Sequence, residues 1–88
     1  MPTVWIPAQM RDLTGGEARV AVTGRNLREV IQNLDARCPG VAERLIEGGR
    51  LSPLVNIAVD SEVSNLGLLQ PVRDDSEIHF IPAVSGGR

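Results

Sequence analysis

Two kinds of reactive side chain are scarce in this chain of 88 residues, which contains no lysine and a single cysteine. Without lysine there is no P-loop lysine, no amine for Schiff-base chemistry and no internal attachment site for a ubiquitin-type chain. The single cysteine, Cys38, excludes an intramolecular disulfide and a CxxC metal or redox site. A reducing, cytoplasmic setting is therefore expected.

Apolar runs of membrane-spanning length are also missing, and we expect neither a membrane partner nor a leader segment. The net charge of -2 gives no electrostatic reason to expect nucleic acid. We find no nucleotide-binding loop, metal cluster or nucleophile–base pair, so the sequence predicts no enzyme, no metal site and no cofactor. Its 42% hydrophobic and 23% charged residues are typical of one small globular domain.

The first half of the chain predicts a hairpin followed by a helix. Residues 3–7 and 19–23 alternate in hydrophobicity, and a long, glycine-containing loop joins them. Asn26 and Glu29 then form a capping-box signal, after which apolar residues recur at helical spacing up to Cys38. This spacing leaves one apolar face, so the helix is expected to pack on a sheet.

The middle of the chain predicts a short helical turn and a third strand. Apolar residues within 41–46 suggest the turn, which the pair Gly48–Gly49 is expected to stop. Residues 54–60 alternate again and predict a strand.

The last part predicts turns and a final strand. Residues 61–77 indicate mostly turns, in which Val63 and the pair Leu68–Leu69 are expected to be buried, in a short edge strand or a helical turn. Residues 78–82 predict the last strand, which leads directly into a tail.

The order of these elements predicts an α+β fold. A mixed sheet with one main helix packed on one face, in which the first hairpin and the last strand supply core residues, is the ubiquitin-like β-grasp arrangement. We assign residues 1–82 to this domain and residues 83–88 to a flexible C-terminal diglycine tail.

The pair Gly86–Gly87 is the most suggestive feature of the tail. Two residues without side chains can enter a narrow channel in another protein. Glycines near a chain end are also common in frayed termini, and spacing alone favours neither interpretation.

The only tryptophan suggests a partner-binding surface. Trp5 has the same parity as His79 and Ile81 if the first and last strands pair in the centre of the sheet. The three side chains would then form an apolar patch on the face away from the helix, beside the root of the tail. The alternative, equally open, is that the loop around Arg11 covers Trp5.

Other reactive groups favour structural roles. Cys38 lies on the apolar side of the helix and is expected to act as a small buried hydrophobe. His79 has no acidic partner at local spacing, so we expect a solvated or hydrogen-bonded histidine and no general base. Asp74 and Asp75 are adjacent in a turn, which indicates solvation and turn geometry.

Four segments resemble the ubiquitin-like sulfur carriers of the ThiS/MoaD-like family. They are Arg11-x-x-Thr14-Gly15-Gly16, Glu43-Arg44-Leu45, Val55-Asn56-Ile57-x-Val59 and Pro82-Ala83-Val84 before the diglycine. The resemblance covers essentially the whole chain and is greatest to carriers that serve cysteine synthesis. The Pro-x-Val-Ser-Gly-Gly ending is its most diagnostic part.

The resemblance implies a carrier without catalytic activity. In such carriers an E1-like, ATP-dependent enzyme adenylates the terminal glycine, which then becomes a thiocarboxylate and delivers sulfur to an acceptor. Here Gly87 would carry the sulfur and Gly86 would give clearance, while Pro82 and Val84 would be held by the partner. The acceptor implied is a PLP-dependent cysteine synthase or another sulfur-accepting enzyme.

Arg88 departs from the family pattern, in which active carriers end at the second glycine. While Arg88 is attached, the Gly87 carboxyl is an amide and cannot be adenylated. The resemblance therefore implies a precursor from which a JAMM-type metallopeptidase removes Arg88, with the processing site between Gly87 and Arg88. A relative that is never activated is the alternative.

Two other functions remain open at this point. A ubiquitin-like protein modifier would share the fold, the activation and the diglycine. A β-grasp binding module would not need Gly86, Gly87 or Arg88 at all.

Overall fold

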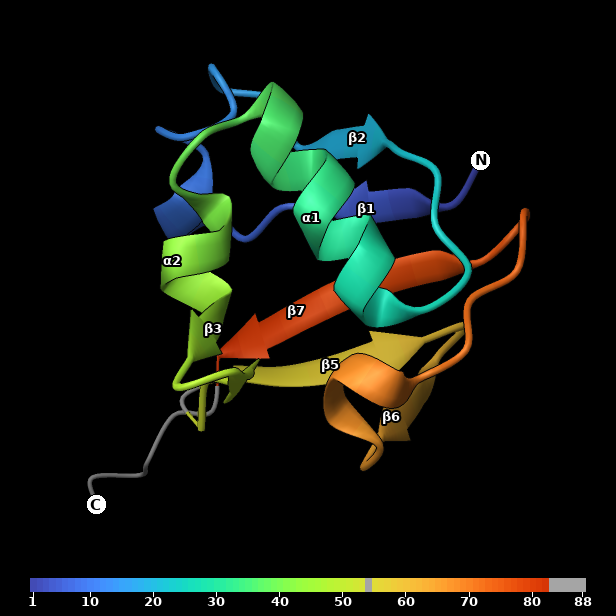
Figure 1. The fold of residues 1–88 in the computed structure, drawn as a ribbon. Coiled ribbons are helices and arrows are strands. Elements are labelled where there is room, and N and C mark those ends of the chain that lie inside the picture. Colours follow the sequence, from blue (N-terminus) through green and yellow to red (C-terminus); the bar gives the residue numbers. More distant parts are fainter. Residues whose placement is uncertain (54, 83–88) are drawn as a thin grey trace.

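The computed structural model describes residues 1–53 and 55–82, and its main feature is a five-stranded sheet with helix α1 (Leu27–Arg37) across one face (Figure 1). In their order across the sheet, the strands are β2 (Arg19–Ala21), β1 (Thr3–Trp5), β7 (Glu77–Pro82), β5 (Val55–Val59) and β6 (Glu62–Ser64). The smaller elements are η1 (Ala8–Met10), α2 (Val41–Leu45), β3 (Ile46–Glu47), β4 (Arg50–Leu51) and η2 (Gly67–Leu69).

The last strand of the described chain occupies the centre of this sheet. β7 runs parallel to β1 and antiparallel to β5, and the antiparallel pairs β1–β2 and β5–β6 flank it on either side. This mixed sheet with one main helix confirms the predicted β-grasp arrangement, including the first hairpin and the central pairing of the first and last strands. The predicted tail, residues 83–88, lies outside the described residues.

The core fills the space between α1 and the sheet. The apolar stripe of the helix, Leu27, Val30, Ile31 and Leu34, is fully buried against inward-facing strand residues such as Ile78. Cys38 packs against this cluster as predicted, but it is only partly buried, because it follows the last residue of the helix.

The start of α1 follows the capping prediction with one difference. The Asn26 side chain accepts a hydrogen bond from the backbone N–H of Glu29 at 2.9 Å, as expected for an N-cap. The Glu29 carboxylate, however, accepts from the backbone N–H of Arg25 at 2.9 Å and not from that of the cap residue. The helix is therefore clamped to the residue before its cap.

The pair Gly48–Gly49 has a different role from the one predicted. α2 already ends at Leu45, and the glycines form the two-residue turn of a small hairpin made by β3 and β4. Both glycines have positive φ, 60° and 79°, which this tight type of hairpin turn requires. A glycine pair that stops a helix and one that turns a hairpin look alike in the sequence.

Two of the hydrophobic residues expected inside are exposed. Val63 is 69% exposed because it sits on edge strand β6, opposite Ala58, with its side chain on the face away from α1. Leu69 is 75% exposed, whereas its neighbour Leu68 is buried in the core. The predicted edge strand and helical turn both exist, as β6 and η2, but each buries fewer side chains than expected.

Candidate docking face of the sheet

The face of the sheet away from α1 carries one continuous row of side chains. Trp5 pairs with Arg19 on β2 and with His79 on β7, and Ala58 on β5 pairs with His79 and with Val63 on β6. Residues that pair across neighbouring strands point to the same face of a sheet. The row therefore crosses all five strands, while alternate residues of β1, β2, β5 and β7 fill the core.

An aromatic pair stands in the middle of this row. The rings of Trp5 and His79 are stacked, with their centroids 5.4 Å apart and their planes 4° from parallel. The guanidinium of Arg19 lies 5.6 Å from the centroid of the Trp5 ring, within the range of a cation–π contact. The Trp5 Nε1–H donates to Oε1 of Glu77 at 3.2 Å. Glu77 and Arg19 together therefore fix the orientation of the Trp5 ring.

Ile81 extends this surface toward the end of β7. It lies two residues beyond His79, on the same face, and is 40% exposed beside Asn56. The structure thus brings Trp5, His79 and Ile81 together on one face, as the alternation predicted. Arg19 and Glu77 were not predicted, because only the pairing register places them beside Trp5.

The loop around Arg11 contacts the end of β1, but within the described residues the groups that stack on the Trp5 ring are His79 and Arg19. The Arg11 Nε–H donates to the backbone oxygen of Ile6 at 3.2 Å, which fixes the loop to the end of β1. Trp5 itself is partly exposed, and the cation over its ring comes from Arg19.

The reactive part predicted for the chain cannot be placed. Val84, Gly86, Gly87 and Arg88 lie outside the described residues, and for Pro82 only the backbone, at the end of β7, is described. Their predicted roles therefore remain predictions.

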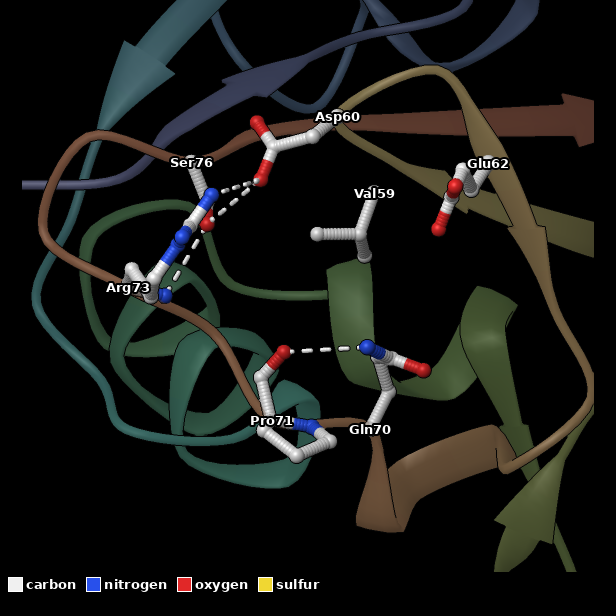
Figure 2. Close-up of a pocket in the computed structure, with 7 residues that line it drawn as sticks. All are labelled: Val59, Asp60, Glu62, Gln70, Pro71, Arg73 and Ser76. Carbon is white, nitrogen blue, oxygen red and sulfur yellow. Dashed lines mark hydrogen bonds and ion pairs between the residues drawn. The ribbon is translucent and has the colours of Figure 1, made fainter.

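A hollow of about 400 Å³ lies at the opposite end of β7 and is lined by Asp60, Arg73 and Ser76, among other residues (Figure 2). Asp60 accepts hydrogen bonds from the backbone N–H of Glu77 at 2.9 Å and from the Ser76 hydroxyl at 3.0 Å, and pairs with Arg73 at 3.6 Å. The Glu77 N–H, followed by the Ser76 hydroxyl, lowers the pKa of Asp60 below its ordinary value. Because its oxygens hold two segments together, Asp60 has a structural role here.

The predicted turn beyond this hollow is present, and Asp75 makes only a long, exposed pairing with Arg73 at 4.0 Å. Asp60 was not predicted from the sequence, where its only signal is an acidic residue directly after a strand. Among the described residues no group of three or more histidine, cysteine and carboxylate side chains could hold a metal ion. No helix in this part of the chain has the length and hydrophobicity needed to cross a membrane.

The strand order, the single main helix and the central last strand define a ubiquitin-like β-grasp protein. The chain belongs to the ThiS family, whose model matches residues 4–87, and it is a CysO-like sulfur carrier. It is 38% identical over 90 residues to the sulfur carrier protein CysO of Mycobacterium tuberculosis, and the match covers 97% of both chains.

Two solved structures have nearly the same fold. A chain of the Amycolatopsis orientalis BexX/CysO complex matches with a TM-score of 0.93 and 34% identity, over 99% of this chain and 100% of that one. The crystal structure of Mycobacterium tuberculosis CysO, described as an antigen, matches with a TM-score of 0.90 and 36% identity, over 96% and 100%.

Proposed function

We propose that this protein carries sulfur as a thiocarboxylate on Gly87 and does not itself catalyse a reaction. The observation that best supports this is the extent of the family match, which runs to Gly87, the second glycine, and leaves Arg88 beyond it. The similarity to CysO over nearly the whole chain supports the same assignment.

The proposed chemistry begins with hydrolysis of the bond between Gly87 and Arg88, which leaves a free Gly87 carboxylate and releases whatever follows it. A carboxylate is a weak electrophile, so an E1-like enzyme must activate it. The carboxylate attacks the α-phosphate of ATP, giving an acyl adenylate and pyrophosphate. Hydrosulfide supplied by a sulfur donor then attacks the acyl carbon and displaces AMP, which leaves with the electron pair of the broken C–O bond, and loss of the thioacid proton gives the thiocarboxylate. Gly86 leaves room for this exchange because it has no side chain.

Docking of the activating enzyme is assigned to the face formed by Trp5, His79 and Ile81, with Pro82 and Val84 held further along the tail. Aromatic and aliphatic side chains at the centre of an interface supply most of its binding energy. In support, the similar CysO of Amycolatopsis orientalis was crystallised in complex with BexX. The proposed acceptor of the sulfur is a PLP-dependent cysteine synthase or another sulfur-accepting enzyme, and the proposed processing enzyme is a JAMM-type metallopeptidase.

Intact-protein mass spectrometry tests this function. The full chain is incubated with the metallopeptidase, and then with ATP, the E1-like enzyme and a sulfur donor. The expected result is loss of the arginine, followed by replacement of one terminal oxygen by sulfur. A version that ends at Gly87 is the control, because it needs no processing. If neither protein acquires sulfur, the carrier proposal is wrong; if instead the chain becomes linked to lysines of other proteins, it acts as a modifier.

A further inference from the structure

A second hollow lies on the helix side of the sheet, away from the Trp5 face. It measures about 400 Å³ and opens between the first turn of α1, the β3–β4 hairpin and η2. We call it the helix-side groove and define it by Arg28 of α1, Arg50 of β4, and Leu66 and Leu69 at the two ends of η2.

The groove presents apolar side chains to solvent. Leu66 is 53% exposed and Leu69 is 75% exposed, while Leu68 between them is buried and anchors the turn to the core. Leu51 of the hairpin also contributes to the lining. Two exposed leucines that line the same concave site favour a surface that another chain covers.

The charge of the groove is opposite to that of the whole protein. Arg28 and Arg50 both line it, and none of the described lining residues is acidic, although the chain has a net charge of -2. Within residues 1–53 and 55–82, ion pairs involve Arg44 and Arg73 but neither arginine of the groove. Guanidinium groups without an internal carboxylate partner favour an anionic ligand, and can bind a carboxylate with two parallel hydrogen bonds.

One side of the groove, the β3–β4 hairpin, lies at the end of the sheet where β7 ends. Only three residues connect Leu51 of β4 to Val55, the first residue of β5, and Val55 pairs with Pro82 at the end of β7. In Figure 1 the hairpin that begins with β3 stands at the arrowhead of β7. A protein that takes up the residues after Pro82 therefore comes close to the groove as well as to the Trp5 face.

We propose that the helix-side groove docks an acidic, apolar segment of the enzyme that activates the tail. The apolar side chains of that segment cover Leu66 and Leu69, and its carboxylates pair with Arg28 and Arg50. The enzyme then holds the domain from both sides of the sheet while it reaches the tail. This inference rests on the proposed function, since it takes the E1-like enzyme as the partner.

Single substitutions test the groove in the full chain, with the purified E1-like enzyme as the probe. Leu69→Ser is expected to raise the Kd about 10-fold and Arg50→Gln about 5-fold, because both side chains leave solvent on docking. Arg50→Gln should also reduce the salt dependence of the Kd, whereas Leu69→Ser should not. Arg25→Gln is the matched control, because it removes the same charge from an exposed position outside the groove lining, and its Kd should stay within 2-fold of the unmodified chain.

The outcomes separate this inference from the proposed function. If the unmodified chain binds the enzyme and acquires sulfur, but Arg50→Gln and Leu69→Ser bind equally well, the groove proposal is overturned and the carrier function stands. If the unmodified chain neither binds nor acquires sulfur, both are overturned. Thermal denaturation of each variant shows that it is folded, and both substituted side chains are exposed, so little change in Tm is expected.

Discussion

Trp5 and His79 stack face to face across two parallel strands, with their ring centroids 5.4 Å apart. A parallel pairing between the first and last strands is what brings residues 74 positions apart into this contact. The stack turns two separate side chains into one flat surface whose orientation is set by Glu77 and Arg19.

Removal of His79 should weaken partner binding more than folding. His79→Ala is expected to raise the Kd for the activating enzyme about 10-fold, because it removes half of the flat surface. The folding cost should be about 0.5–1.5 kcal/mol, the range for one aromatic pair. Isothermal titration calorimetry and urea denaturation measure the two effects. Gln32→Ala, on the exposed side of α1, is the control; an equal loss of affinity there would contradict this assignment.

The carboxyl of Asp60 should make stability depend on pH in the acid range. Its pKa is lowered from an ordinary value of 3.8, mainly by the Glu77 N–H, so the folded state favours the charged form. The stabilisation is therefore fully present above about pH 5 and is lost as the pH falls below the ordinary value and through the lowered one.

Urea midpoints measured from pH 7 down to pH 2 test this dependence. Asp60→Asn should unfold more easily at neutral pH and lose part of the acid-induced decrease. Asp74→Asn, a change of the same charge in the neighbouring exposed turn, should keep the steep decrease. If the urea midpoints of Asp60→Asn and the unmodified chain fell in parallel with pH, protonation of Asp60 would not contribute to the acid-induced loss of stability.

The N-cap of α1 should contribute about 1 kcal/mol to the free energy of unfolding. Asn26→Ala removes the acceptor for the Glu29 N–H and leaves that donor without its partner in the first turn. Asn26→Ser keeps an acceptor oxygen and should recover most of the loss. Chemical denaturation measures all three proteins, and equal stability of the alanine and serine variants would count against a capping role.

Gly24 should not tolerate a side chain. A Cβ at this position would lie 2.6 Å from Cγ2 and 2.8 Å from the backbone nitrogen of Val30. Because a helix backbone cannot move aside cheaply, Gly24→Ala is expected to cost about 1–3 kcal/mol, the range for overpacking. At Gly15 nothing lies within 4 Å, so Gly15→Ala should show only the smaller cost of its positive φ. Thermal denaturation measures the loss of Tm for each variant, and the loss for Gly24→Ala should be the larger of the two.

Bulk in the diglycine should block activation without affecting the fold. Gly86→Val, in a chain that ends at Gly87, is expected to abolish formation of the thiocarboxylate, since a branched side chain would obstruct entry to the activating site. Its Tm should match that of the unsubstituted chain, and mass spectrometry reports the sulfur. Full thiocarboxylation of this variant would show that clearance is not the reason for the glycine.

The parts of the fold that local patterns determine were predictable. Asn26 and the helical spacing after it locate α1, and the alternation around Trp5 and Ile81 correctly assigns these side chains to the outer face. Both signals depend only on residues that are close together in the sequence, so they can be recognised without a structure.

The rest depended on contacts between distant segments. Val63 is hydrophobic yet exposed because β6 is an edge strand whose outer face has no helix over it, which no local pattern reveals. Arg19 reaches Trp5 only through the register of the hairpin, and the groove around Leu69 requires α1 and the β3–β4 hairpin to meet. The role proposed for Gly87 rests on the family match, because this residue lies outside the described part of the chain.

The central position of β7 has a mechanical consequence. A pull on the residues after Pro82 acts along a strand that is hydrogen-bonded on both sides, to β1 and to β5. Such a load shears both ladders at once and cannot open them one bond at a time, as it could at an edge strand. A partner can therefore apply a strong pulling force to the residues after Pro82 while the domain stays folded. An ATP-driven unfoldase that pulls from this end should unfold the domain slowly.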